Sequence, residues 1–313
     1  MKFWAVLIWI VVIIAIAVPI FLYGAFGRPW LTMNWRDTVE NGTVSGILLR
    51  SQTWRGEIQT SGDVYVAWWA RLQIEPGTRV VIAATDDQQA GSEPALNPDD
   101  VVVNDPTNST DYTRSHVEIK GTIVAEGTAE EPIIFTVTDP PTEYAAWQGV
   151  VLRDGSKLKH VQIDNVQNGI VTSAPVSLDN VNIERCLWNC LYVGKESANV
   201  INSRFSLAWH QAVLVASDAS PFFKNNEFAR SAIGMKLVQV AKPVVLQNRF
   251  IDNAIAVYLE TAGKATFENN ALESPTGPAV SGGSFEGNVI YLNNWNPGNG
   301  EKIEGTDLIS DKI

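Results

Sequence analysis

Acidic side chains are the residues of this chain whose chemistry could break a glycosidic bond or hold a metal ion. Two adjacent pairs, Asp86-Asp87 and Asp99-Asp100, lie in one acidic segment, residues 85–115. Hydrolysis of a glycosidic bond needs two carboxylates at a fixed separation, so the acids must occupy matching positions in the fold. Five further acids lie in a repeated part of the chain, each at a different position of the repeat: Asp154, Asp164, Asp179, Asp218 and Asp252. The sequence therefore predicts no catalytic carboxylate pair.

The histidines and cysteines do not indicate a nucleophilic or metal centre either. The three histidines occupy unrelated positions in the repeat, so they supply no base beside a nucleophile: His116, His160 and His210. Cys186 and Cys190 lack the spacing of a zinc site. We expect them to be small, partly buried thiols, which pair only if the local bend permits it. We therefore predict no catalytic residue, no metal, no cofactor and no enzymatic activity.

Tryptophans are the candidate binding residues. Trp188 and Trp209 lie in successive copies of the repeat, and if both point outward they stack about 5 Å apart. An exposed aromatic stripe of this kind can bind sugar rings or another protein. The alternative is that they pack under a local bend. Trp68, Trp69 and Trp147 are expected to pack in the core or at an edge. The predicted partner-binding residues are Trp4, Trp9, Trp30, Trp35, Trp188 and Trp209.

A pattern that returns about every 22 residues between Ser156 and Trp295 must position these side chains. One apolar residue anchors each copy: Ile163, Ile183, Phe205, Phe228, Phe250, Leu272 and Ile290. A second apolar residue lies five positions earlier: Leu158, Leu178, Val200, Phe223, Val245, Phe267 and Phe285. A third follows the first six anchors by seven or eight positions: Ile170, Leu191, Val213, Met235, Val257 and Val280. An asparagine lies two positions before the last four anchors: Asn226, Asn248, Asn270 and Asn288.

This period and composition predict a coil of short strands. The apolar segments are 4–6 residues long, rich in Val, Ile and Phe, and separated by Asn, Gly, Ser and Pro. Repeats of 20–50 residues are typical of solenoids, so each turn should supply three strands that pair in parallel with the next turn. The asparagines fit a tight bend, because Asn tolerates left-handed backbone and its amide can bond to the backbone or to the next asparagine.

The segments before the repeat carry a family resemblance. They read GDVYV from residue 62, LQIEPGTRV from 72, VEIKGTIVAEGTAEEPIIFT from 117 and WQGVVL from 147. This order resembles the opening turns of bacterial surface-type right-handed parallel β-helix proteins, and the later Asn-x-Phe turns resemble the generic β-helix repeat. The resemblance covers about residues 45–295. It implies the fold but not one function, because this architecture serves polysaccharide lyases, hydrolases, adhesins and structural proteins.

The start of the chain predicts an uncleaved membrane anchor. Residues 3–23 carry no charge, and a helix of this length crosses roughly 30 Å of hydrocarbon. A cleaved signal peptide is the alternative, but its apolar core usually has about 7–15 residues and a small-residue cleavage site. We therefore predict an all-β protein, a right-handed parallel β-helix preceded by one transmembrane α-helix.

The predicted organisation has four parts. They are an anchor at 1–27, a connector and N-terminal cap at 28–60, the β-helix at 61–297 with the insertion 85–115, and a C-terminal cap or tail at 298–313. The insertion holds seven acids and one arginine, which suits a solvated or partner-contacting loop. Calcium binding there is an open alternative, although the spacing of a calcium loop is absent.

Net charge limits the partners. With a net charge of −11, the chain lacks the clustered Lys and Arg that nucleic acids require, so no nucleic-acid partner is expected.

We expect a non-enzymatic accessory subunit of the bacterial inner membrane, with one span and the coil on the periplasmic or extracellular side. Its coil would bind and stabilise other membrane proteins in a larger complex, such as a respiratory or photosynthetic one. The alternative function is a cell-surface polysaccharide-binding or adhesin-like β-helix.

Overall fold

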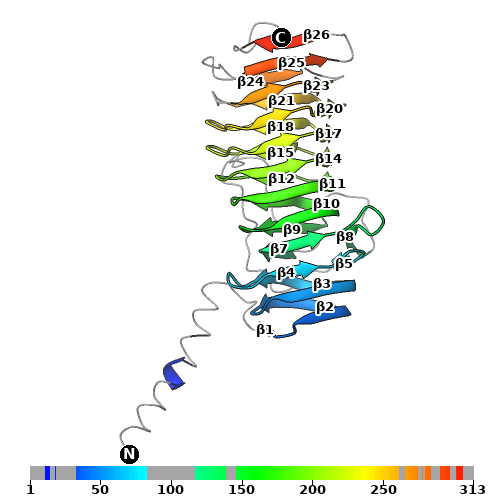
Figure 1. Ribbon diagram of the computed structural model, residues 1–313, viewed down its shortest axis with the longest axis vertical. Helices are drawn as coiled ribbons and strands as arrows, with labels where there is room; N and C mark the ends of the chain where they lie inside the picture. Colours follow the sequence, from blue (N-terminus) through cyan, green and yellow to red (C-terminus); the bar gives the residue numbers. More distant parts are fainter. Residues whose placement is uncertain are drawn as a thin grey trace, which may run out of the picture.

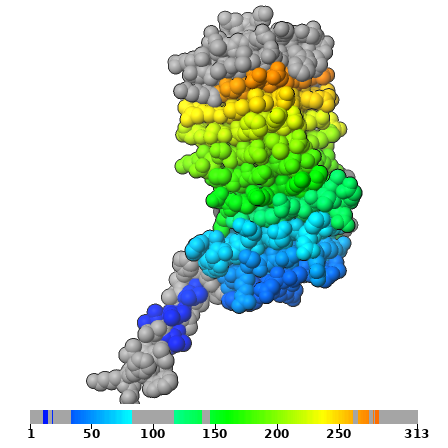
Figure 2. All heavy atoms as spheres, in the orientation of Figure 1, coloured from blue at the N-terminus to red at the C-terminus, as the bar shows by residue number. Residues whose placement is uncertain are grey.

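The strands of this chain wind into one long coil of stacked turns. The computed structural model describes residues 11–14, 18, 33–82, 117–138, 146–260, 265–273, 277, 279–282, 290–296 and 301–305. Each turn supplies strands to three faces, and the turns follow one another along the axis from β1 to β26 (Figure 1). The space-filling view shows the turns closely packed on one another (Figure 2).

Three faces run along the coil, and four long strands bend around its corners from one face to the next. The long strands are β2 (Thr38–Leu48), β3 (Gln52–Val66), β10 (Lys157–Thr172) and β11 (Val176–Cys186). Face 1 also contains β4 (Leu72–Ile74), β7 (Ile123–Glu126), β13 (Ala198–Ile201), β16 (Phe222–Lys224), β19 (Val244–Leu246) and β22 (Thr266–Glu268). Face 2 contains β5 (Arg79–Ile82), β8 (Ile133–Val137), β14 (Arg204–Ala208), β17 (Glu227–Ala229), β20 (Arg249–Ile251) and β23 (Ala271–Leu272). Face 3 contains β1 (Met33–Asn34), β6 (Glu118–Gly121), β9 (Trp147–Leu152), β12 (Asn189–Val193), β15 (Gln211–Val215), β18 (Ile233–Leu237), β21 (Ile255–Leu259) and β24 (Val280–Gly282). The last two strands are β25 (Ile290–Asn296) and β26 (Glu301–Gly305), which pair with each other in antiparallel orientation.

The parallel register confirms the three predicted apolar columns over most of their length. The anchor column runs in register from Ile163 to Leu272. The second column runs from Leu158 to Phe267, and the third from Ile170 to Val280.

The predicted columns fail at the C-terminal end of the coil, where the interval between copies shortens. Ile290 pairs with Thr266 on face 1, so it does not continue the anchor column as predicted. Tyr291 pairs with Phe267 and takes the place in the second column that was predicted for Phe285, a residue outside the described ones.

The coil also begins earlier than the predicted boundary at residue 61. Met33 and Asn34 pair with β2, and β2 pairs along its length with β3. The segment 28–60, expected to be a connector and cap, therefore contributes turns of the coil from residue 33 onward. Trp54 of this segment is fully buried, because its turn already encloses the core.

Phenylalanines fill the middle of the coil. Phe205, Phe228 and Phe250 are fully buried and stack along the axis, with ring centroids 5.8 and 4.8 Å apart. Phe223 of face 1 meets Phe228 edge to face at 6.0 Å. Burial of such rings is the main source of stability of the stack.

In the turns from β10 to β22, the corners between faces 1 and 2 and between faces 2 and 3 are formed by residues with left-handed backbone. Between faces 1 and 2, the residues with φ of 46° to 57° are His160, Asn180, Asn202, Asn225, Gln247 and Asn269. Between faces 2 and 3, they are Asn165, Arg185, Leu207, Arg230 and Asp252, with φ of 51° to 57°. The left-handed residue at the first corner thus precedes each asparagine of the predicted column, so assigning that backbone to Asn226, Asn248 and Asn270 was wrong by one position.

The asparagine column is instead a buried hydrogen-bond ladder. Oδ1 of Asn248 accepts bonds from the backbone N–H and Nδ2 of Asn226, at 2.8 and 2.9 Å. In the same way, Oδ1 of Asn270 accepts bonds from the backbone N–H and Nδ2 of Asn248, at 2.8 and 3.1 Å. This confirms the predicted amide contacts between turns, and Asn288 lies outside the described residues. A second ladder, at the next corner, joins Ser231 to Asn253.

The predicted membrane anchor lies mostly outside the described residues. Residues 11–14 and 18 are helical, and their apolar side chains are exposed. Among the residues described, no helix has the length and apolarity needed to cross a membrane.

The two cysteines were expected to be partly buried thiols, but Cys186 and Cys190 form a disulfide and are fully buried. The bend at the corner between β11 and β12 brings their Cα atoms to 5.3 Å.

Candidate functional site

Trp188 and Trp209 do not form the predicted aromatic pair. Asn189 lies beside Gln211 in the register, so Trp188 lies beside His210 of the next turn. Trp188 and His210 stack with ring centroids 4.5 Å apart. Trp188 is only 9% exposed, whereas Trp209 is 59% exposed. Trp188 therefore packs as the alternative anticipated, and the two indoles do not share one binding face.

Exposed tryptophans occur instead at the N-terminal end of the coil. Trp68 and Trp69 are 77% and 55% exposed, which corrects the expectation that they pack in the core or at an edge. Their rings meet at 86° with centroids 5.2 Å apart. Trp147 is buried as expected, and Trp35 is 58% exposed. Three predicted partner-binding residues lie outside the described ones: Trp4, Trp9 and Trp30.

The paired tryptophans lie at the corner between faces 3 and 1, where corner length varies from turn to turn. The corner in their own turn has five residues, 67–71, and the corner two turns later has four, 153–156. Between them, Thr122 alone joins β6 to β7. Gly121 makes this short corner possible, since its φ is 150° and a Cβ there would lie 2.4 Å from Cβ of Val66. A long corner therefore overhangs a short one.

A groove of about 440 Å³ occupies the space beside the short corner. Trp68 and Trp69 form its aromatic wall. The other lining side chains that can hydrogen-bond are Ser51, Gln52, Thr53, Arg71, Gln73, Thr122 and Asp154. An aromatic wall combined with several polar side chains is the usual chemistry of a small-molecule or sugar site.

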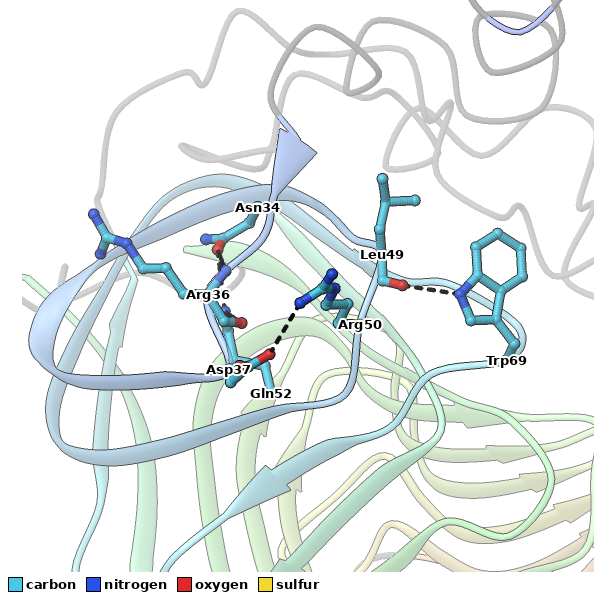
Figure 3. A network of polar contacts seen from close by, with 7 residues as sticks. All are labelled: Asn34, Arg36, Asp37, Leu49, Arg50, Gln52 and Trp69. Atoms are coloured by element: carbon cyan, nitrogen blue, oxygen red, sulfur yellow. Dashed lines mark hydrogen bonds and ion pairs between the residues drawn. The ribbon is translucent and has the colours of Figure 1, made fainter.

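Hydrogen bonds between neighbouring corners hold the groove in shape. Nε1 of Trp69 donates to the Leu49 carbonyl at 2.9 Å, and the Arg71 N–H donates to Oγ of Ser51 at 3.0 Å. Figure 3 shows Trp69 pointing toward Leu49 at the N-terminal end of the coil. These bonds fix the corner within the fold itself, which reduces the ordering that binding requires.

A buried glutamine supports the first turns from below the groove. Gln52 is 1% exposed, and its Nε2 donates to Oδ1 of Asn34 and to the Arg36 carbonyl, at 3.1 and 2.9 Å (Figure 3). Its Oε1 accepts a bond from Nε1 of Trp54 at 2.6 Å. These contacts tie the first corner of the coil to the strand that forms the floor of the groove.

Arginines make this edge more basic than the rest of the protein. The corners between faces 3 and 1 in the first five turns contain Arg36, Arg50, Arg71 and Arg153 against two acids, Asp37 and Asp154, a net charge of 4 − 2 = +2. The whole chain carries −11. Arg50 lies 3.9 Å from Asp37, and its guanidinium lies 5.9 Å from the ring centroid of Trp35.

A second polar centre lies on face 3, where β3 pairs with β6. The Glu118 N–H donates to Oδ1 of Asp63 at 2.8 Å, and the Tyr65 hydroxyl donates to Oδ2 of Asp63 at 3.1 Å. Asp63 and Glu118 are 0% and 6% exposed. Burial raises the pKa of the Glu118 carboxyl, while Lys120, Tyr65 and Arg153 act to lower that pKa. This carboxylate pair was not predicted from the sequence, because 55 residues separate its members.

The acids that the sequence analysis considered do not come together in a catalytic arrangement. Asp164 pairs with Arg185, and Asp218 lies 3.7 Å from Lys242. Asp179 accepts a bond from Asn202 at 2.9 Å. Among the residues described, no group of three or more His, Cys, Asp or Glu side chains could hold a metal ion. The acidic pairs of the insertion lie outside those residues.

Comparison with known proteins agrees with this architecture. The family model described as "right handed beta helix region" matches residues 161–307, slightly less than half of the chain. No curated protein and no solved structure matches the chain. The matched family model and the three-faced parallel register together show that this chain is a right-handed parallel β-helix protein.

Proposed function

We propose that this protein is a membrane-anchored β-helix that binds a polysaccharide in the groove beside Trp68 and Trp69. The observation that carries the proposal is the pairing of two exposed indoles with a groove lined by hydroxyl, amide and charged side chains. A sugar ring offers an apolar face to an indole and hydroxyl groups to polar side chains. The groove supplies partners for both.

Two features support the proposed location of the protein: the predicted membrane anchor and the disulfide. The uncharged residues 3–23 suit one membrane span, and the described part of this segment, residues 11–14 and 18, is helical with exposed apolar side chains. The Cys186–Cys190 disulfide suits an oxidising compartment. We therefore place the anchor in a bacterial inner membrane and the coil on its periplasmic or extracellular side.

The groove is proposed to bind its ligand without cleaving it. Hydrolysis of a glycosidic bond generally uses two carboxylates on either side of the bond. Asp154 is the single carboxylate among the groove-lining residues described. Asp63 and Glu118 form a carboxylate pair elsewhere, but both are buried on face 3. The prediction of a non-enzymatic function is therefore retained in the proposal.

A binding assay with indole variants tests this proposal. The full chain in mild detergent is titrated with soluble polysaccharides: polygalacturonate, alginate, hyaluronate, dextran, xylan and a mixed-linkage glucan. We expect at least one to bind, and Trp68→Ala and Trp69→Ala each to weaken that binding about tenfold or more, because buried indoles dominate binding surfaces.

Trp209→Ala is the matched control, since this exposed indole lies outside the groove lining. It should bind as the wild type does. The proposal fails if no polysaccharide binds, or if both groove variants keep wild-type affinity.

The accessory subunit is a second candidate function, favoured by the Trp35–Arg50 contact. Both side chains are exposed at the N-terminal end of the coil, near the predicted anchor, and Trp and Arg are the residues that most often dominate protein interfaces. Extraction in mild detergent followed by sizing tests it. A stoichiometric membrane-protein partner that is lost in Trp35→Ala but kept in Trp68→Ala supports this function, and migration of the protein alone contradicts it.

A further inference from the structure

We propose that the groove selects acidic polysaccharides, with the guanidinium of Arg71 binding an anionic group of the ligand. This inference rests on the proposed function and names the ligand class of the same groove. Three observations carry it. Arg71 has no ion-pair partner among the described residues, the corners of this edge carry a net positive charge, and Trp68 and Trp69 lie on the same corner as Arg71.

Arg71 has an exposed side chain on a fixed backbone. It is the last residue of the five-residue corner that carries Trp68 and Trp69, and its own N–H is bonded to Oγ of Ser51. Within the described part of the chain, no carboxylate forms an ion pair with its guanidinium. Some other described arginines do have such partners, for example Arg55 with Glu40 and Arg185 with Asp164. Arg71 therefore offers its donors to a ligand.

The chemistry of a guanidinium favours an anionic partner in this position. Its planar donors match the two oxygens of a carboxylate, and the same donors fit the oxygens of a phosphate or sulfate group. Trp68 and Trp69 lie three and two residues before Arg71, respectively, on the same corner. A sugar ring stacked on either indole would present its charged substituent at the neighbouring guanidinium.

The charge of the surroundings acts in the same direction. The corner residues of the first five turns carry a net +2, although the chain as a whole carries −11. An acidic polymer is repelled by most of this protein and attracted to this edge, and such contrast steers encounter as well as affinity.

Asp154 places a negative charge in the groove, opposite in sign to the charge of Arg71. Its exposed carboxylate lines the same groove and belongs to the corner on the other side of Thr122. Toward an acidic ligand its charge is repulsive. Neutralising Asp154 must therefore strengthen binding if the ligand is acidic, whereas neutralising Arg71 must weaken it.

The test compares Arg71→Gln and Asp154→Asn in the full chain, with the acidic polymers polygalacturonate, alginate and hyaluronate and the neutral polymers dextran, xylan and mixed-linkage glucan. The wild type should bind at least one acidic polymer about tenfold more tightly than any neutral one. Arg71→Gln should remove that preference, while Asp154→Asn should tighten acidic binding about two- to fivefold. Arg71→Lys should keep part of the preference, because it keeps the charge without the planar fork.

Two results would overturn the inference while leaving the proposed function intact. One is equal wild-type affinity for neutral and acidic polymers, with both still dependent on Trp68. The other is an equal loss of both kinds of binding in Arg71→Gln, which would make Arg71 a support of the corner. Absence of binding to every polymer is different, since it contradicts the proposed function itself.

Discussion

Replacing Asn248 with alanine tests the ladder that joins the turns at the corner between faces 1 and 2. The side chain is 1% exposed and its Nδ2 donates to the carbonyls of Phe223 and Leu246, at 3.1 and 3.0 Å. Its Oδ1 accepts the backbone N–H of Asn226 at 2.8 Å. The alanine variant removes all of these contacts.

The magnitude follows from the groups that lose a partner. The Asn226 N–H and the Phe223 carbonyl are buried backbone groups, and each buried group left without a hydrogen bond costs about 1–3 kcal/mol. Together they predict a loss of about 2–6 kcal/mol in the free energy of unfolding. Nδ2 of Asn226 keeps its bond to the Val200 carbonyl, so the ladder should break only locally.

Denaturant unfolding of the full chain in detergent, followed by circular dichroism, measures this loss. Hydrogen exchange should show faster exchange of the Asn226 amide in the variant. Asn199→Ala is the control, because this asparagine of β13 is exposed and should change stability by less than about 0.5 kcal/mol. A loss below about 1 kcal/mol with an unchanged Asn226 amide would refute the reasoning, since the ladder would then carry no buried bonds.

Three further predictions concern the core, the face 3 carboxylates and the disulfide. Phe228→Ala should cost about 3–5 kcal/mol in unfolding experiments, and Lys224→Ala almost nothing; a cost below about 1 kcal/mol for Phe228 would contradict its central place in the stack. Because burial raises the pKa of Glu118 above its ordinary 4.5, the wild type should lose melting temperature relative to Glu118→Gln as pH rises from about 4.5 through the folded pKa, whereas the difference between the two should not depend on pH below 4.5; a difference that also stays constant as pH rises through that range would contradict the burial argument. Reduction of the Cys186–Cys190 disulfide should lower stability by about 2 kcal/mol, the value for a short loop, and no change on reduction would show that the bond does not form in the folded protein.

The sequence predicted the coil because its apolar positions recur with one period. From Ile163 to Leu272 each anchor lies in register with the next, since a one-residue slip would turn the whole core face toward solvent. The prediction failed where the period changed. After the shorter interval, Ile290 pairs with Thr266 on face 1 instead of continuing the anchor column.

The candidate site was harder to predict because it depends on corner lengths. Corners between faces 3 and 1 range from the single residue Thr122 to the six residues 216–221, with five residues at 67–71, and periodicity gives no information about such connections. Trp68 and Trp69 have large apolar side chains, so they were predicted to pack in the core or at an edge. Their adjacency was the available signal, because two neighbouring residues of a strand cannot both point inward.

The central claim, that Trp68 and Trp69 hold a sugar chain, is tested most directly by oxidative footprinting of the full chain with and without saturating polysaccharide. Oxidation of Trp68 and Trp69 should fall several-fold on binding, while oxidation of Trp209 should stay constant because this exposed indole lies outside the groove lining. Unchanged oxidation of Trp68 and Trp69 in the presence of a bound polysaccharide would place the binding site elsewhere and contradict the proposed function.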